Sequence, residues 1–122
     1  MKTRHIKIND EVARTVAGII RSEMSDPRIG PVVSVVRAEV TADLKFCKIW
    51  VSVPGNEETR QETMAALNKA AGFVRKRVAE LVNLRITPEF SFVYDDSIEY
   101  GMRMRRLIDE VNTAAPVREE AE

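Results

Sequence analysis

Few side chains in this sequence have the chemistry that catalysis needs. The chain has one histidine, His5, and one cysteine, Cys47. A nucleophilic site places Ser, Cys or Thr beside a base, but an expected helix and strand separate these two residues. Cys47 falls on the apolar face of its expected strand, which favours a buried structural thiol. The five glycines are scattered, so no phosphate-binding loop is present. We therefore expect no catalytic residue, no metal and no cofactor.

One group of carboxylates, Asp95, Asp96 and Glu99, allows two interpretations. Carboxylates so close together can hold Mg²⁺ or transfer protons, as in a metal-dependent nuclease. They also stand where an expected strand meets an expected helix, and carboxylates at that position cap the helix and interact with its dipole. We favour capping, and the nuclease stays an alternative that magnesium-dependent cleavage would reveal.

The basic residues are concentrated in three segments. The chain has 19 Lys plus Arg and 19 Asp plus Glu, so its formal net charge is zero. Proteins that bind nucleic acid usually carry a basic surplus, but a neutral total conceals an uneven distribution. Ten cations stand in stretches without an acid, and the rest of the chain carries the balancing negative charge. The ten are Lys2, Arg4 and Lys7; Lys69, Arg75, Lys76 and Arg77; and Arg103, Arg105 and Arg106.

The middle basic segment lies on an expected helix, which allows a geometric test. At 100° per residue, Lys69 and Lys76 point away from the apolar stripe, and Gly72 lies on the same exposed face. Arg75 and Arg77 flank the stripe on its two sides. This arrangement suits a nucleic-acid backbone lying along the helix, because phosphates are bound mainly by Lys and Arg. The candidate RNA-binding residues are Arg4, Lys7, Lys45, Lys48, Lys69, Gly72, Arg75, Lys76 and Arg77.

Two aromatic residues have ambiguous positions. On a straight helix Phe73 would point outward, so either the chain bends at Gly72 and turns the ring inward, or the ring is exposed for base stacking. We favour the bend. Trp50 lies on the polar face of its expected strand, where covering by a helix is the more common outcome.

Length and composition exclude several classes of protein. A chain of 122 residues predicts one domain. One cysteine cannot form an internal disulfide, which fits a reducing compartment. No apolar stretch is long enough for a signal peptide or a membrane span. We expect a cytoplasmic protein.

The first half of the chain predicts a helix followed by a hairpin. Apolar residues from Ile8 to Met24 recur every three or four positions, as in an amphipathic helix. Asn9 is its expected N-cap, and Asp26-Pro27 its expected end. Alternating apolar residues over 32–41 and 45–53 then predict two strands in an antiparallel hairpin.

The second half predicts two helices, a strand and a last helix. A helical pattern from 57 to 81 contains Gly72, which indicates a bend, a close approach or a junction of two helices. Phe90, Phe92 and Tyr94 form one face of a third strand. The resulting order is helix, strand, strand, helix, helix, strand, helix. It predicts a three-stranded sheet with helices on one face, a two-layer α+β sandwich.

The last expected helix runs from 98 to about 111. Residues 114–122 contain Pro116 and a run of charges without periodicity, which predicts a disordered acidic tail. Residues 1–113 are then a single domain.

Three motifs occur in a specific order. They are DPRIG at 26–30, VRAEVTADLKFCKIWVSV at 36–53 and ALNKAAGFVRKRVAELVNLRITPEFSFVYDDSIEYG at 66–101. With these motifs the chain resembles the ribosome-binding factor A family over about residues 4–111. The resemblance implies a type II KH-like domain in which the usual GxxG loop is replaced by a helix kink, matched here by Ala70, Ala71 and Gly72. It also implies a monomer that binds the 16S rRNA of the immature small (30S) ribosomal subunit and promotes late maturation and rRNA processing without catalysis, with no membrane and no small-molecule substrate.

A protein-interaction adaptor is the rival hypothesis. Such a module would use an acidic patch or a sheet edge to bind a protein. Its binding would survive nuclease treatment and reversal of the basic helix charges. Binding through RNA phosphates would instead weaken steeply as salt rises.

Overall fold

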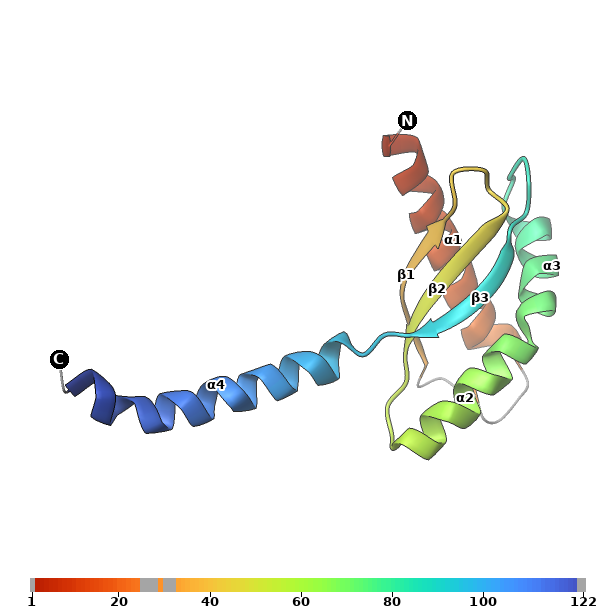
Figure 1. The fold of residues 1–122 in the computed structure, drawn as a ribbon. Coiled ribbons are helices and arrows are strands. Elements are labelled where there is room, and N and C mark those ends of the chain that lie inside the picture. The colour runs from red at the N-terminus through yellow and green to blue at the C-terminus, as the bar shows by residue number, and fades with distance from the viewer. Residues whose placement is uncertain (1, 25–28, 30–32, 121–122) are drawn as a thin grey trace.

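The structure, a computed structural model, describes the backbone of residues 2–24, 29 and 33–120, and the side chains of 5–24, 29 and 33–112. The predicted order of elements is confirmed (Figure 1). Of the DPRIG motif, only Ile29 lies among the described residues, and it is buried. The elements are α1 (Lys2–Glu23), β1 (Ser34–Val40), β2 (Phe46–Ser52), α2 (Glu57–Lys69), α3 (Ala71–Leu81), β3 (Glu89–Tyr94) and α4 (Ser97–Glu120).

The three strands form one mixed sheet in the order β1-β2-β3. β1 and β2 are antiparallel, which confirms the hairpin, and β3 runs parallel to β2. In the connecting turn, the Asp43 carboxylate accepts hydrogen bonds from the Thr41 hydroxyl and the Lys45 N–H, and Leu44 takes a positive φ of 65°. Helices α1, α2 and α3 lie on one side of the sheet (Figure 1), so the two-layer prediction is confirmed.

The core lies between the sheet and these three helices. Buried residues alternate with exposed or half-buried ones in each strand, except at the start of β1, where a bulge between Val35 and Arg37 leaves Val36 exposed. The buried strand residues pack against the apolar stripes of the helices, as the periodicities predict. Buried members from the sheet are Ala38, Val40, Cys47, Ile49, Val51, Phe90 and Phe92; from the helices they include Val12, Val16, Ile19, Leu67, Val74 and Val78.

Two asparagines on the helices hydrogen-bond the outer edges of the sheet. Asn68 of α2 donates through Nδ2 to the Phe92 carbonyl oxygen (3.2 Å) and accepts through Oδ1 from the Phe92 N–H (2.8 Å). On the opposite edge, Asn9 Oδ1 accepts from the Val40 N–H (2.9 Å), and His5 Nε2 donates to the Val40 carbonyl oxygen. Each asparagine side chain therefore hydrogen-bonds edge backbone groups that a further strand would otherwise pair.

The expected start of α1 at Asn9 is wrong. The helix begins at Lys2, so Asn9 lies inside it and is not the N-cap. The reason is tertiary: the Asn9 side chain is engaged with Val40 across 31 positions of sequence and does not turn back to its own helix. His5 is half-buried against the same strand.

The last helix is longer than expected. α4 continues past Val111 to Glu120, through residues that the sequence predicted to form an irregular tail. Alanines 114 and 115 favour helix. The division into a domain of residues 1–113 and a tail of 114–122 stays a prediction.

An ion pair joins α3 to α1. The Arg77 guanidinium donates through Nε and Nη2 to both carboxylate oxygens of Glu23, and through Nη1 to Glu80. The hydrogen bonds from Arg77 lower the pKa of the Glu23 carboxyl below its usual value. Arg77 and Glu23 are 54 positions apart, so this pair fixes the relative placement of two helices.

Replacing Asn68 with alanine should destabilise the fold. The N–H and carbonyl of Phe92, a residue only 4% exposed, would lose their side-chain partners. We expect a loss of about 1–2 kcal/mol in the free energy of unfolding, measured by urea denaturation. Asn83→Ala is the matched control, because Asn83 is exposed, and it should change stability by less than about 0.5 kcal/mol. Equal effects of the two substitutions would contradict the edge role of Asn68.

Replacing Glu23 with glutamine should make stability less dependent on acid pH. Because the folded-state pKa of Glu23 is lowered, its pairing stabilises the fold above the usual carboxyl pKa of 4.5 and is lost as pH falls through the folded-state value. Wild type should therefore be the more stable protein at pH 7, and the difference should shrink towards pH 3. Urea titrations at both pH values measure this. Glu11→Gln, at an exposed position of the same helix, is the control.

Candidate nucleic-acid interface

The junction of α2 and α3 lies at Ala70. This residue leaves helical geometry (φ −89°, ψ 4°), and its N–H is shared between the carbonyl oxygens of Ala66 and Leu67. The predicted junction is thus confirmed, two residues before Gly72. Gly72 itself lies in the first turn of α3, where a Cβ would meet no other atom within 4 Å. The Gly72 backbone is therefore open to solvent, and the close approach considered from sequence does not occur within the described residues.

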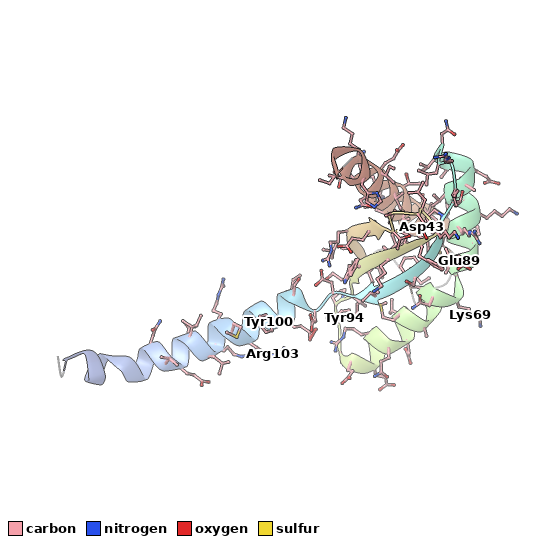
Figure 2. The ribbon with its side chains drawn as sticks, turned by 45° about the horizontal axis from the view of Figure 1, so that its top comes forward. Asp43, Lys69, Glu89, Tyr94, Tyr100 and Arg103 are labelled. Carbon is pink, nitrogen blue, oxygen red and sulfur yellow. The ribbon has the colours of Figure 1, made fainter. Side chains whose placement is uncertain are left out.

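Exposed cations precede and follow this open backbone along the chain. Lys69 ends α2, and Arg75 and Lys76 follow in the next turn of α3; all three are exposed. Neither lysine has an ion-pair partner among the described residues, so both ammonium groups are available to an anion. Figure 2 shows Lys69 at the outer side of the helical layer.

Arg75 also anchors the chain between α3 and β3. Its Nη2 donates to the Thr87 carbonyl oxygen (3.2 Å). Two residues earlier on this segment, Arg85 is exposed. The N–H of Glu89, which follows the segment, donates to the Lys45 carbonyl oxygen (2.9 Å). Arg75, Arg85 and Lys45 are thus cations at one end of the domain. Arg85 escapes sequence reasoning, because an isolated arginine in a loop belongs to no periodic pattern.

The other candidates do not all join this surface. Lys48 alternates with buried Cys47 and Ile49, so it lies on the sheet face opposite the helices. Lys7 is exposed on α1. Arg77 is bound to Glu23 and Glu80, which leaves it less available to a phosphate. Arg4 lies in α1, and its side chain is outside the described residues. The fold therefore does not place all the candidate cations on one face.

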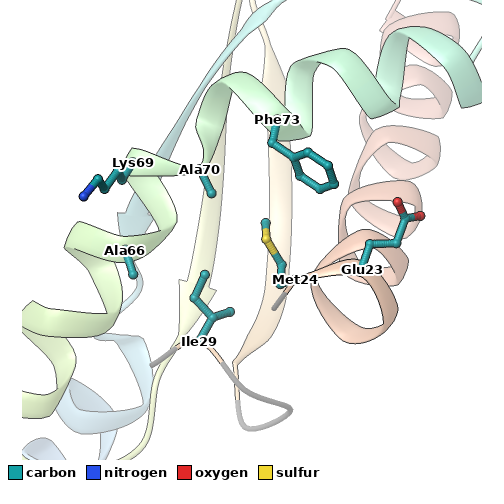
Figure 3. Close-up of a pocket in the computed structure, with 7 residues that line it drawn as sticks. All are labelled: Glu23, Met24, Ile29, Ala66, Lys69, Ala70 and Phe73. Atoms are coloured by element: carbon teal, nitrogen blue, oxygen red, sulfur yellow. The ribbon is translucent and has the colours of Figure 1, made fainter. Parts of the chain in front are cut away.

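A hollow of about 220 Å³ opens beside the junction. Phe73 lines this hollow, but its ring stays 41% exposed, so the bend at Ala70 does not turn the ring into the core as favoured from sequence. Figure 3 shows Phe73 and Met24 on its inner side and Lys69 pointing away from them. The lining residues are Glu23, Met24, Ile29, Ala66, Lys69, Ala70 and Phe73.

The Trp50 ring is covered by a cation and not by a helix. The Arg37 guanidinium carbon lies 3.9 Å from the ring centroid, on the open face of the sheet. The expectation of a covering helix is wrong, because all three packed helices occupy the other face (Figure 1). Trp50 is half-buried as a result.

Two of the three clustered carboxylates, and the single thiol, have structural roles. The Asp95 carboxylate accepts a hydrogen bond from the Ser97 N–H (2.8 Å) and thereby caps α4, which confirms the capping prediction; this bond lowers the pKa of Asp95. Glu99 pairs with Arg60 at 3.3 Å and accepts from the Tyr94 hydroxyl. Cys47 is 1% exposed, as predicted, and burial raises the pKa of its thiol to about 12.

The described residues hold no group of three or more His, Cys, Asp or Glu side chains placed to bind a metal ion. No helix among them has both the length and the apolar character that crossing a bilayer requires.

Comparison with known proteins agrees with this arrangement of elements. The family model described as "Ribosome-binding factor A" matches residues 4–108. A ribosome-binding factor A from Lachnospira eligens is 50% identical over 108 residues, which are 88% of this chain and 83% of that protein.

Solved structures share the fold. The crystal structure of ribosome-binding factor A from Thermus thermophilus superposes with a TM-score of 0.65 at 21% identity, over 74% of this chain and 94% of that one. A homology model of the Thermus thermophilus factor, fitted into a cryo-electron microscopy map of its complex with the 30S subunit, has a TM-score of 0.57 at 20% identity, over 72% and 91% of the two chains. The match of the family model to most of the chain, together with the 50% identity, shows that this chain belongs to the ribosome-binding factor A family.

Proposed function

We propose that this chain binds the immature small (30S) ribosomal subunit through its 16S rRNA and promotes late maturation and rRNA processing. Its family and the 30S complex of the Thermus thermophilus factor support the subunit as the target. The observation that carries the RNA contact is the exposed backbone at Gly72 between Lys69 and Lys76, whose ammonium groups have no ion-pair partner among the described residues.

The chemistry of this surface favours a phosphate backbone over a base-specific contact. Lys69 and Lys76 are long, mobile cations, which neutralise phosphates as point charges. Gly72 has no side chain, so a sugar-phosphate strand can approach the helix closely there. Arg75 and Arg85 extend the positive charge toward the end of the domain that also holds Lys45.

In this proposal the chain promotes maturation by binding rRNA and not by catalysing a reaction. Of the clustered carboxylates, Asp95 caps a helix and Glu99 is in an ion pair, and the thiol is buried in the core. We propose that one copy of the chain, acting in the cytoplasm without a cofactor, holds rRNA in a conformation that later maturation steps require. The acidic remainder of the surface would repel RNA from other orientations.

Reversing the charge of both lysines should weaken binding. Lys69→Glu with Lys76→Glu removes two phosphate contacts, so affinity for immature 30S subunits should fall at least tenfold. The slope of log affinity against log salt should also become shallower by about 2. Co-sedimentation at several salt concentrations measures both quantities.

The matched control for this experiment changes two cations elsewhere. Arg105→Glu with Arg106→Glu on α4 alters the net charge by the same amount and should leave most of the affinity. Equal losses in the two double variants would mean that binding responds only to net charge, and the proposed surface would be wrong. Binding that persists after nuclease treatment would favour the protein-adaptor hypothesis.

Replacing Gly72 with alanine should separate stability from binding. The added methyl group meets no atom of the described residues and improves helix propensity, so the free energy of unfolding should rise by about 0.5–1 kcal/mol. The same methyl group would stand between the helix and an approaching backbone, so affinity for the subunit should fall several-fold. Gly18→Ala in α1, also without a neighbour within 4 Å, is the control that should gain stability and keep affinity. Unchanged binding of Gly72→Ala would exclude close RNA approach at this point.

A further inference from the structure

Helix α4 extends away from the domain with an apolar face that nothing in the described structure covers (Figure 1). Its first turn is attached to the domain through Glu99, which pairs with Arg60 and Tyr94. Beyond that turn, large apolar side chains along the helix are 38–56% exposed. An exposed stripe of this size usually marks an interaction surface.

The spacing of these residues is that of a coiled-coil seam. Tyr100, Met104, Leu107 and Val111 are separated by four, three and four positions, which places them on one face of the helix. They are 55%, 38%, 52% and 55% exposed. Ile108, 53% exposed, widens the stripe on one flank.

Two residues on one flank of the seam carry opposite charges at different positions along the helix. On a helical wheel, Arg103 and Glu110 fall on the same flank, seven positions apart. The guanidinium carbon of Arg103 lies 5.9 Å from the centroid of the Tyr100 ring, so this cation borders the apolar face (Figure 2). Gly101 and Ile108 occupy the other flank.

We propose that α4 pairs with α4 of a second copy in an antiparallel arrangement. A two-fold axis midway between Met104 and Leu107 places Met104 opposite the other copy's Leu107, and Tyr100 opposite its Val111. Like flanks face each other in an antiparallel pair, so Arg103 of each helix meets Glu110 of the other. On the second flank, bulky Ile108 faces the small Gly101.

The flanking charges select this orientation over a parallel one. In a parallel pair, Arg103 would face Ile108 of the other helix, and neither Arg103 nor Glu110 would meet an opposite charge. In the antiparallel pair, the two-fold symmetry produces two Arg103–Glu110 contacts, so each of these charges meets an opposite one. The flanking charges thus make the seam self-complementary in the antiparallel orientation only.

A second copy fits this face better than the open sheet of the same chain. Folding back onto that sheet would break the contacts of Glu99 with Arg60 and Tyr94, which direct the helix outward. In the antiparallel pair the two domains attach at opposite ends of the paired segment.

The contact area sets the expected strength of the dimer. Two heptads on each helix bury less than about 1,200 Å² in total, which is the range of weak, transient complexes. We expect a dissociation constant on the order of 50 µM. Free chains then pair only when concentrated, which is compatible with one copy acting on each subunit.

Sedimentation equilibrium of the full chain from about 5 to 500 µM tests the proposal without any ribosome, so its outcome is independent of the proposed function. The weight-average mass of the wild type should rise from monomer towards dimer. Leu107→Glu should weaken association at least tenfold. Met102→Glu makes the same change at an exposed residue on the opposite face of α4 and should leave association unchanged.

Charge exchange tests the orientation. Arg103→Glu and Glu110→Arg should each weaken association, and the double variant should restore it. A wild type that stays monomeric across the range, or equal effects of Leu107→Glu and Met102→Glu, would overturn self-association. Failure of the double variant to restore it would overturn the antiparallel pairing. Thermal unfolding followed by circular dichroism should be unchanged in all variants at low concentration, because α4 does not form part of the core.

Discussion

A sheet of three strands has two open edges, and the backbone groups along them need partners that no further strand supplies. In this molecule the helices provide those partners. Asn9 of α1 hydrogen-bonds one edge at Val40, and Asn68 of α2 hydrogen-bonds the other at Phe92. Each bond is directional, so it sets the position of the helix along the strand, which apolar packing alone would leave free to slide.

The placement of the basic surface follows from these edge contacts. Asn68 fixes the last turn of α2, and the chain leaves helical geometry two residues later at Ala70. Lys69 and Gly72 therefore stand at a defined corner of the helical layer. Arg77 then ties α3 to α1 through Glu23. Arg77 thus serves the fold and Arg75 also contacts the backbone at Thr87, whereas Lys69 and Lys76 are left for a ligand. The one-sided arrangement of the helices also leaves the outer face of the sheet without a helix, and Arg37 shields Trp50 there.

The sequence by itself determined the features that depend on neighbouring residues. Period-two and period-three-to-four patterns predicted the strands, the helices and the burial of Cys47, because backbone geometry alone decides which side chains share a face. The cap at Asp95 and the helix junction near Gly72 were equally local. The family resemblance carried the functional expectation, which the family comparisons then supported.

Only the tertiary structure decided how distant side chains pair. Asn9 looked like a helix cap, yet it binds a strand 31 positions away, and Arg77 binds a carboxylate 54 positions away. Lys48 is a candidate RNA-binding residue but lies on the sheet face opposite the helices that carry Lys69, because the position of the helices relative to the sheet assigns the faces. The contacts of Glu99 direct α4 away from the domain, so its apolar stripe cannot be buried in the same core. Such pairings depend on the path of the whole chain, and a hydrogen bond between two elements leaves no periodic signal in either of them.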